Sequence, residues 1–515
     1  MKVRPLLTLA AMSVVATLGL TACGGPDSGG GNGSTDSGAP KTLTIGAAIA
    51  PTTFSPQEAA DAHNVQWFQP VYDNLVRQLP DGEFEPMIAE EWEYNDDNTV
   101  LTMKLNDGVT FASGGELDAA TVEANLEATR DGSGPLASQF VSIKDVVVVD
   151  PLTVEIQLHA PDPALMRSLS QPGGTMTKIE KIGDESLATE PDGTGPYVLD
   201  ASRTVSGSEY VFTKREDYWN TDLELPFDTI VVKPMTDITA RINALASGQV
   251  DAAPIDTKSQ ATVEGSGAEV LTYPGAGVMG LFLLDRAGEI APALADVRVR
   301  QAINMALDRA NMLATLRSGY GAATQQVFNP QSDAYDAALD ETYPFDKDKA
   351  LKLMADAGYA DGFTVKSPDV SSFFPEATIA AQALADIGVN IEWVSVAQTE
   401  TLSEMLSGKY PLVLMQLQST EPWQTVQFFI APDAAWNARD SQDPELDKLI
   451  EKAQYADPGQ AQAAAFQELN EWLVDQAWFA PFYFADNIFA ISSDVTVEPQ
   501  VYQGVPSIYN YAPAS

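Results

Sequence analysis

The chain has 515 residues, and its 45% hydrophobic and 20% charged content is ordinary for a folded globular protein. Its 72 acidic residues outnumber 29 basic residues and leave a net charge of −43, which repels phosphate backbones, so we expect no nucleic-acid partner. With two histidines and one cysteine, the chain has little material for Ser-His-Asp or Cys-His catalysis, for a disulfide or for a metal site rich in His or Cys.

Residues 1–22 have the pattern of a secretory signal. Two basic residues precede an apolar stretch over 6–20 that is too short for an ordinary membrane-spanning helix and ends in small residues. The following "LTAC" is similar to a bacterial lipobox, in which the signal is cut before the cysteine and the thiol carries diacylglycerol. We therefore expect lipidation of Cys23; the alternative is a free thiol in a discarded peptide.

Residues 23–40 are rich in Gly and Ser and have no apolar periodicity, so we expect a flexible tether. The remaining chain, 41–515, is too long for one hydrophobic core, and we expect it to form two or three lobes. It contains no later apolar run long enough to span a bilayer. An anchor followed by a tether would hold these lobes near a membrane surface while leaving them free to turn.

The first part of the folded region reads mostly as short strands. The patterns predict, in chain order, a strand at 41–50, a helix-like stretch at 56–79, a meander of strands with Asp-Asn and Asp-Gly turns at 81–114, a helix at 118–128 and a hairpin at 143–161. After residue 185 they predict strands at 193–200, 209–219 and 227–235, and then a helix and a short strand within 237–255.

Beyond residue 290 helices dominate and alternate with strands, which predicts an α/β lobe. The predicted elements are one long amphipathic helix at 296–317, a capped helix at 346–358, a helix at 375–388 that runs into a strand at 389–396, and a helix at 401–408 that runs into a strand at 410–418. The segments 428–456 and 461–492 continue in the same style.

The sequence "GAGVMG" at 275–280 matches the G-x-G-x-x-G pattern that wraps a dinucleotide pyrophosphate. That reading requires a helix after the glycines, whereas "LFLLD" follows and reads as another strand. We therefore reject NAD or FAD binding and predict that the glycines allow two backbones to approach or the chain to bend between lobes. The sequence contains no G-x-S-x-G elbow and no P-loop, and we expect no catalytic residue, no cofactor and no metal.

Several segments, in order, resemble the family 5 solute-binding proteins, the extracellular receptors of peptide/nickel-type ABC importers. The resemblance rests on the acidic "PMIAEEW" with its meander, "GTGPYVL", "REDYWN", "LASGQVDAAPI", "ADVRVRQAINMALDR" and "PFDKDKALKLMADAGYADGF", and extends from about residue 42 to about 511. It implies an α/β, two-lobed, periplasmic-binding-protein-like fold with an extra subdomain in the first lobe. It also implies that ligand binds between lobes that close over it.

The same resemblance implies boundaries. The first lobe would comprise 41–71, 186–275 and 488–515, the extra subdomain 72–185 and the second lobe 276–487. The chain would cross between lobes near 272–282 and near 484–492, which places Gly275, Gly277 and Gly280 at a hinge.

Three segments are expected to face the ligand. The loop after the first strand would supply Thr52, Thr53 and Phe54 with His63 nearby, the first crossing would supply Val278 and Met279, and a loop of the second lobe would supply Gln418, Ser419, Thr420 and Trp423, followed by Trp436 and Asn437. Both tryptophans lie in predicted loops, where aromatic residues often line pockets; the alternative is that they pack in the core.

One position departs from the family pattern. Peptide-binding members carry an aspartate four residues before a proline in the second-lobe loop, where it pairs with the peptide α-ammonium. In "QSTEPW" the proline is Pro422, so the matching residue is Gln418, an uncharged amide. Members with the aspartate also carry an acidic residue at the position of Glu421, so we interpret Glu421 as structural.

The resemblance implies a monomeric lipoprotein on the outer face of the cytoplasmic membrane that captures a small peptide or similar polar organic solute. Its partners would be an ABC permease and the associated ATPase, with no enzymatic activity of its own. The alternatives are a sugar, opine or metal-chelate ligand in the same fold, an exported hydrolase that uses carboxylates, or a surface protein for signalling or adhesion.

Overall fold

The computed structural model describes residues 41–60, 62–397 and 400–514. The predicted signal, Cys23 and the tether lie outside the described residues. In the part of the chain that the structure describes, no helix has both the length and the apolar character needed to cross a bilayer.

A seven-stranded mixed sheet forms one half of the folded region, which we call the first lobe. Its central strand β1 (Thr42–Ala47) pairs in parallel with β10 (Thr229–Pro234) and with β11 (Ala252–Ile255). The remaining strands are antiparallel to their neighbours and comprise β8 (Tyr197–Leu199), β9 (Tyr210–Lys214), β12 (Glu269–Tyr273) and β19 (Asn487–Ile491). A core rich in aromatic side chains packs on this sheet, and helices α4 (Ile238–Ala246) and α5 (Gln260–Glu264) contribute to a second, smaller core.

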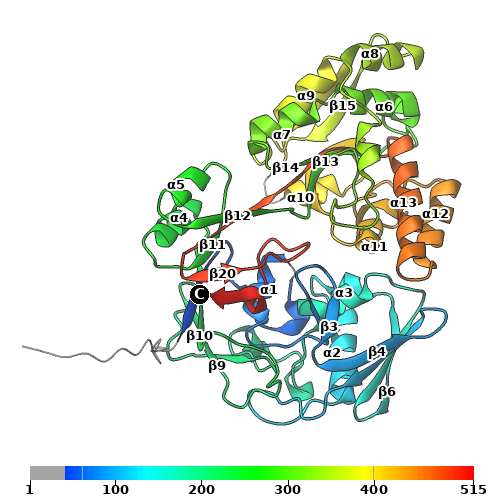
Figure 1. Ribbon diagram of the computed structural model, residues 1–515. Coiled ribbons are helices and arrows are strands. Elements are labelled where there is room, and N and C mark those ends of the chain that lie inside the picture. Colours follow the sequence, from blue (N-terminus) through cyan, green and yellow to red (C-terminus); the bar gives the residue numbers. More distant parts are fainter. Residues whose placement is uncertain (1–40, 61, 398–399, 515) are drawn as a thin grey trace, which may run out of the picture. The chain divides into compact units, whose positions relative to one another are not determined.

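A separate four-stranded antiparallel sheet and helix α2 (Ala119–Arg130) form an additional subdomain with a hydrophobic core of its own. The strand order is β4-β5-β7-β6, with bounds Ala89–Tyr94, Val100–Leu105, Thr153–Leu158 and Ile143–Asp150 (Figure 1). The Asp118 carboxylate accepts the backbone N–H of Thr121, which fixes the start of α2. The predicted meander, helix and hairpin are thus confirmed.

The prediction of a helix over 56–79 is wrong. The segment contains only one turn of α-helix, α1 (Val65–Phe68), with short 3₁₀ turns before it and strand β2 (Val76–Gln78) after it. Pro70 has no N–H to continue the helical hydrogen bonds, so α1 stops just before it. Strand β2 then pairs with β3 (Phe84–Pro86), and the short helix α3 (Leu165–Ser170) packs nearby.

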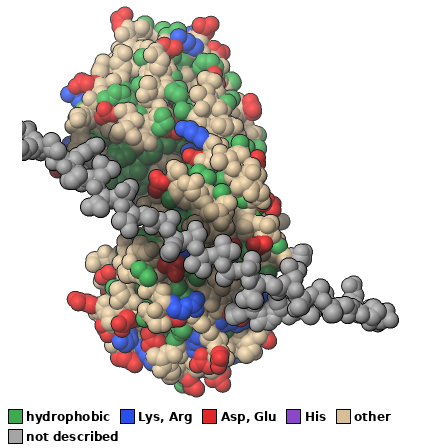
Figure 2. All heavy atoms as spheres, turned by 90° about the vertical axis from the view of Figure 1, so that its left-hand side faces the viewer, with side chains coloured by type: hydrophobic (Ala, Val, Ile, Leu, Met, Phe, Trp, Pro, Cys, Tyr) green, Lys and Arg blue, Asp and Glu red, His purple; other side chains and the backbone are tan. Residues whose placement is uncertain are grey.

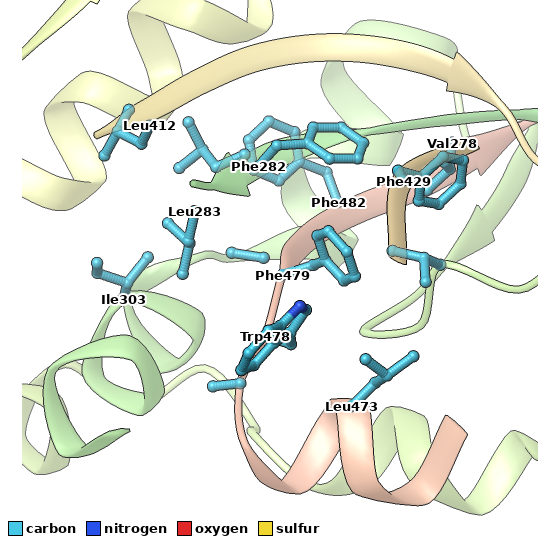
Figure 3. Close-up of a cluster of buried hydrophobic side chains, with 14 of the residues drawn as sticks. Val278, Phe282, Leu283, Ile303, Leu412, Phe429, Leu473, Trp478, Phe479 and Phe482 are labelled. Atoms are coloured by element: carbon cyan, nitrogen blue, oxygen red, sulfur yellow. The ribbon is translucent and has the colours of Figure 1, made fainter. Parts of the chain in front are cut away.

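A second four-stranded sheet and the helices around it form the other half, which we call the second lobe. Its order is β14-β18-β13-β17, with bounds Gly321–Ala323, Ala480–Ala485, Gly277–Leu283 and Leu412–Gln418. Phe282, Phe429 and Phe479 pack edge to face beside this sheet, with ring centroids 5.6–6.1 Å apart (Figure 3). The two-stranded parallel sheet of β15 (Phe363–Pro368) and β16 (Val389–Val394) lies beside β17.

The helices of the second lobe follow the predicted order with two differences. They comprise α6 (Val297–Ala306), α7 (Arg309–Arg317), α8 (Lys347–Asp356), α9 (Glu376–Ala385), α10 (Thr401–Met405), α11 (Pro422–Thr425), α12 (Pro444–Gln454) and α13 (Gln460–Asp475). The first difference is α11, a single turn that continues into a π-helical turn over Val426–Ile430 where the sequence predicted a loop.

The second difference is that the predicted helix at 296–317 is two helices. Leu307 has an extended backbone, and the Asp308 carboxylate accepts the N–H of Asn311 to begin α7. The buried Arg309 then donates to the carbonyl oxygen of Pro481 on β18 and to Asn304. Hydrogen bonds from Arg309 to β18 and to Asn304 therefore hold the chain where the helix is interrupted at Leu307. The periodicity of the sequence alone predicted a continuous helix.

The chain passes between the two sheets twice. Residues 274–276 connect β12 to β13, and Asp486 connects β18 to β19 (Figure 1). A Cβ on Gly275 would lie 2.3 Å from the carbonyl oxygen of Ala485, so the two connections lie against each other at van der Waals distance. Strand β13 begins within "GAGVMG" and continues through the predicted strand residues after it, which confirms that the motif lacks the helix a dinucleotide site requires.

The three glycines differ in position. Only Gly275 lies in the connection; Gly277 and Gly280 lie inside β13, opposite Gln418 and Met415 of β17. A Cβ on Gly280 would lie 2.7 Å from the Cα of Pro481, which explains the glycine as a requirement for close strand approach.

We predict that Gly275→Ala lowers the free energy of unfolding by about 1–3 kcal/mol, because the added methyl group would meet the rigid carbonyl of Ala485. Gly277→Ala is the matched comparison, since its nearest neighbour is the amide end of Gln416, a half-buried side chain that can rotate away. Denaturant unfolding of both variants measures the difference. Equal stability of the two variants would contradict this account of Gly275.

Candidate functional site

Three neighbouring cavities lie between the two lobes, and together we call them the interlobe cleft. The central cavity has a volume of about 370 Å³, and its walls are Gln78, Asp81, Gly82, Glu83, Pro163, Val501 and Tyr502 from the first lobe and Gln331, Asp333, Glu421, Pro422, Trp423, Gly459, Gln462, Ala463 and Phe466 from the second. A cavity of about 590 Å³ shares Trp423 with it, and one of about 150 Å³ shares Pro163 and Gln462. Residues of both lobes therefore face the same space.

The side chain of Glu421 lines the central cavity at the start of α11. Its carboxylate makes no hydrogen bond or ion pair with any residue that the structure describes. Burial raises the pKa of Glu421 to about 7, while the positive charge of Arg167 lowers it and the negative charge of Asp162 raises it further. The side chain is half-buried by its accessible surface, and a carboxylate in that position without a partner can accept a hydrogen bond from a ligand.

Aromatic side chains form much of the remaining wall. Trp423 is 6% exposed, and its indole N–H has no hydrogen-bond partner among the described residues. Tyr502 has a φ of 57°, an uncommon conformation for a residue with a side chain. The Arg167 guanidinium lies 5.5 Å from the ring centroid of Tyr502. Flat apolar faces beside an unpartnered carboxylate suit an organic ligand with a polar end.

Arg167 supplies the positive charge nearest to Glu421, but it does not line the cavities. It is buried, 4% exposed, and its Nη1 donates to Oε1 of Gln78 at 3.1 Å. Gln78 and Tyr502 belong to the cavity wall, so the guanidinium lies behind that wall. Arg167 therefore acts on the cleft by its electrostatic field and not by direct contact.

Hydrogen bonds attach the cleft loop to the first connection between the lobes. The backbone N–H of Ser419 donates to the carbonyl oxygen of Ala276 at 2.7 Å. The fully buried Asn329 donates through Nδ2 to the carbonyl oxygens of both Gly275 and Ser419, at 3.2 and 2.9 Å. The loop that presents Glu421 is therefore held against the segment at which the lobes join.

The predicted contacts of the first lobe lie away from the cavities. Thr53 accepts the N–H of Ser55, and Phe54 is 2% exposed in the core of the seven-stranded sheet, where its carbonyl oxygen accepts the hydroxyl of Tyr72. His63 contacts Gly504, and burial lowers the pKa of its imidazole. Thr52 is exposed and, like these residues, lines none of the three cavities.

Among the predicted contacts of the second lobe, only Trp423 lines the cleft, and it does so from α11 rather than from a loop. Val278 and Met279 are buried in the interior of the sheet, and Trp436 packs in the hydrophobic core of the second lobe. The side chains of Ser419 and Thr420 form hydrogen bonds with those of Thr425 and Gln424. Asn437 donates hydrogen bonds to backbone carbonyl oxygens of its own loop. Gln418 is exposed at the end of β17 and does not line the cavities.

The interpretation of Glu421 as structural stays a prediction, and the structure adds that its carboxylate lines the cavity without a hydrogen-bond or ion-pair partner among the described residues. Sequence reasoning also missed Tyr502 and Asp333. Glu421 stands directly before the proline of "QSTEPW", which offered a signal in the sequence; Tyr502 lies in the C-terminal segment after β20 (Val495–Val497) and offered none.

Comparison with known proteins agrees with this architecture. A family model described as "Bacterial extracellular solute-binding proteins, family 5 Middle" matches residues 83–438. The chain belongs to this family. It is therefore a substrate-binding protein of the type that serves ABC importers, and not an enzyme. The two-lobed α/β fold expected from the sequence is confirmed.

Among curated proteins, the glutathione-binding protein GsiB of Salmonella paratyphi A is 30% identical over 349 residues, which cover 66% of each chain. GsiB of Escherichia coli (strain K12) is 27% identical over 363 residues, which cover 69% of each chain. The chain thus aligns with about two thirds of the length of these relatives.

Among solved structures, HbpA2 from Haemophilus parasuis superposes with a TM-score of 0.81 at 22% identity, over 92% of this chain and 100% of that one. DppA from Helicobacter pylori in complex with the peptide STSA gives a TM-score of 0.75 at 19% identity, over 92% and 98%. NikZ from Campylobacter jejuni in complex with Ni(L-His) gives 0.73 at 21% identity, over 92% and 100%. These likenesses establish the fold.

We predict that Glu421→Gln changes how stability depends on pH. Burial raises the pKa of Glu421 in the folded protein to about 7, above its value in the unfolded chain. The folded state therefore gains stability from the protonated carboxyl at acid pH, and this gain is lost as the pH rises through 7. Relative to Glu421→Gln, the unliganded wild type should lose about 1–2 kcal/mol between pH 5 and pH 8, after allowance for partial exposure. Urea unfolding at several pH values measures this.

Glu471→Gln is the matched control, since Glu471 is exposed on α13 and lines none of the three cavities. It should leave the pH profile of wild type unchanged. Parallel profiles for wild type and Glu421→Gln would contradict the assignment of Glu421 as a half-buried carboxyl with a raised pKa.

Proposed function

We propose that this protein captures a small peptide or similar polar organic solute in the interlobe cleft and delivers it to the permease of an ABC importer. The observation that carries the proposal is the cleft itself, in which residues of both lobes surround a cavity of about 370 Å³ and Glu421 lacks a partner. Relatives of the same fold support the ligand class, since their names state glutathione, the peptide STSA and Met-Leu as ligands.

The physical basis of capture is a shift between open and closed states. A ligand that contacts both lobes binds the closed state more tightly and favours it by that difference in affinity. The two side-by-side connections at Gly275 and Asp486 are the segments about which such closure would occur. The closed form would then dock on the permease, and an associated ATPase would supply the energy.

We also propose the lobe boundaries predicted from the sequence, with 41–71, 186–275 and 488–515 in the first lobe, 72–185 in the extra subdomain and 276–487 in the second lobe. Membership of the strands supports them, because β13, β14, β17 and β18 share one sheet and β1, β8 to β12 and β19 share another. We expect the receptor to act as a monomer on the outer face of the cytoplasmic membrane.

A thermal-shift screen with dipeptides, tripeptides, glutathione, opines and oligosaccharides tests the ligand class. A ligand present at a hundred times its dissociation constant should stabilise the protein by about 2.7 kcal/mol and raise the melting temperature. A shift with an oligosaccharide and none with any peptide would overturn the proposed substrate class while leaving the family unaffected.

The proposed lipid anchor predicts a change in cell fractionation. Cys23→Ser removes the thiol that would carry diacylglycerol, so the variant should leave the membrane fraction and appear in the soluble extracytoplasmic fraction. Ser13→Ala, in the preceding apolar stretch, is the control and should remain with the membrane. Membrane retention of Cys23→Ser would exclude lipidation as the anchor.

A further inference from the structure

The largest of the three cleft cavities has mostly hydrophobic walls, and we call it the apolar cavity. Its volume is about 590 Å³, and most of the residues that line it are apolar, among them Val141, Val426, Phe428 and Ile450. The others are serine, glutamine and one aspartate, Asp433. Acidic side chains are spread over the surface seen in Figure 2. The apolar cavity differs from that surface, since among the described residues one carboxylate and no basic side chain line it.

The additional subdomain forms one wall of the apolar cavity and the second lobe forms the other. Val141 precedes β6 of the subdomain, whereas Phe428 belongs to the second lobe. Gln454 of α12 also lines the cavity, and its Nε2 donates to the carbonyl oxygen of Pro161 in the subdomain at 3.0 Å. Trp423 lines both the apolar cavity and the central one. The apolar cavity is therefore an extension of the central cavity, and a direct hydrogen bond joins its two walls.

Each wall leaves one large hydrophobic side chain uncovered. Val141 is 61% exposed on the wall of the subdomain, and Phe428 is 44% exposed on the wall of the second lobe. Uncovered apolar surface of this kind often marks a ligand-binding groove. The volume of the cavity lies in the range of pockets that bury small organic groups. An apolar group placed between these two side chains would remove the surface of both from water, which favours its binding.

A π-helical turn presents Phe428 to the cavity. The turn spans Val426–Ile430 and is closed by the N–H of Ala431, which donates to the first carbonyl oxygen of the turn at 2.8 Å. The next residue, Phe429, is fully buried and packs edge to face with Phe282 (Figure 3). Because π-helical turns are rare and occur frequently at functional sites, the turn is an observation separate from the cavity that points to a function for the uncovered ring.

We infer that the apolar cavity is a subsite for an aromatic or branched aliphatic side chain of the ligand, and that Phe428 and Val141 determine this specificity from opposite walls. The inference rests on the proposed function and narrows its substrate class to small peptides that carry such a side chain. The polar backbone of the same ligand would lie in the central cavity, where the wall offers hydrogen-bonding side chains such as Gln78, Gln331 and Gln462. A side chain that carries a carboxylate is disfavoured in the subsite, because no basic residue among those described lines it.

Isothermal titration calorimetry of the full-length protein in phospholipid nanodiscs tests the inference; detergent is avoided because it would itself enter an apolar cavity. The ligands are trialanine and six variants of it, with phenylalanine or asparagine in place of the first, second or third alanine. We expect a phenylalanine peptide to bind at least about tenfold more tightly than both trialanine and the asparagine peptide of the same position. Equal affinity for phenylalanine and asparagine peptides at all three positions would overturn the inference and leave the receptor function intact.

Substitution of the exposed phenylalanine assigns the preference to the cavity. Phe428→Asn should reduce the ratio of phenylalanine-peptide to asparagine-peptide affinity by at least about tenfold. Phe373→Asn is the matched control, since Phe373 is 45% exposed and lines none of the three cavities. It should leave the ratio unchanged. An unchanged ratio in Phe428→Asn would overturn the inference.

A second variant tests the contribution of the additional subdomain from the opposite wall. Val141→Asn should also reduce the ratio of phenylalanine-peptide to asparagine-peptide affinity, because it replaces apolar surface of the subsite by an amide. Val205→Asn is its matched control, since Val205 is 60% exposed in the first lobe and lines none of the three cavities. Equal ratios for Val141→Asn and Val205→Asn would exclude the subdomain from the subsite and overturn the inference.

Three further probes, methyl β-glucoside, phenyl β-glucoside and octanoate, separate failure of the inference from failure of the proposed function. Binding of phenyl β-glucoside that depends on Phe428, without binding of methyl β-glucoside or of any peptide, would support the apolar subsite and overturn the peptide class. Binding of octanoate that depends on Phe428, without binding of phenyl β-glucoside or of any phenylalanine peptide, would make an alkyl chain the occupant and overturn the inference. Absence of binding by every peptide and every probe would overturn both the inference and the proposed peptide class.

Discussion

The structure depends on the close approach of two backbone segments where the chain passes between its sheets. Gly275 and Ala485 lie so near each other that a single Cβ does not fit between them. The seven-stranded sheet takes β12 and β19 from one side of these segments, and the four-stranded sheet takes β13 and β18 from the other. The distance between the cleft walls of the two lobes therefore depends on these few residues.

The cleft wall depends on the same place. Asn329 bonds the carbonyl oxygens of Gly275 and Ser419, and the N–H of Ser419 bonds Ala276, so the loop that presents Glu421 is fixed to the connection. A shift of the connection would move the loop with it, because buried amide bonds are costly to leave unmade. This gives a direct physical route from lobe position to the placement of the carboxylate.

Two buried charged residues where the additional subdomain meets the seven-stranded sheet have several hydrogen-bond partners. Arg215 donates to the carbonyl oxygens of Thr110 and Phe111 in the additional subdomain. Asp73 accepts the hydroxyl of Tyr218 and the indole N–H of Trp219, even though burial raises the pKa of Asp73 to about 7. These contacts explain the "REDYWN" segment as a bridge between subdomain and sheet.

The amino-acid sequence by itself determined the family, the α/β class, the order of most elements and the strand after "GAGVMG", because periodicity, caps and turn residues are local signals that survive without tertiary context. It also predicted Trp423 on the cleft wall. It failed for the helix at 56–79, where Pro70 follows the single helical turn, and for the continuous helix at 296–317.

Only the tertiary structure decided which side chains face the cleft. Phe54 and Trp436 pack in cores, whereas Tyr502 and Asp333, from segments about 170 residues apart, meet Glu421 at one cavity. Burial and the absence of a partner, rather than residue type, give that carboxyl its raised pKa, and both are properties of packing between distant segments. A sequence read along the chain contains the residue but not the surroundings that raise its pKa.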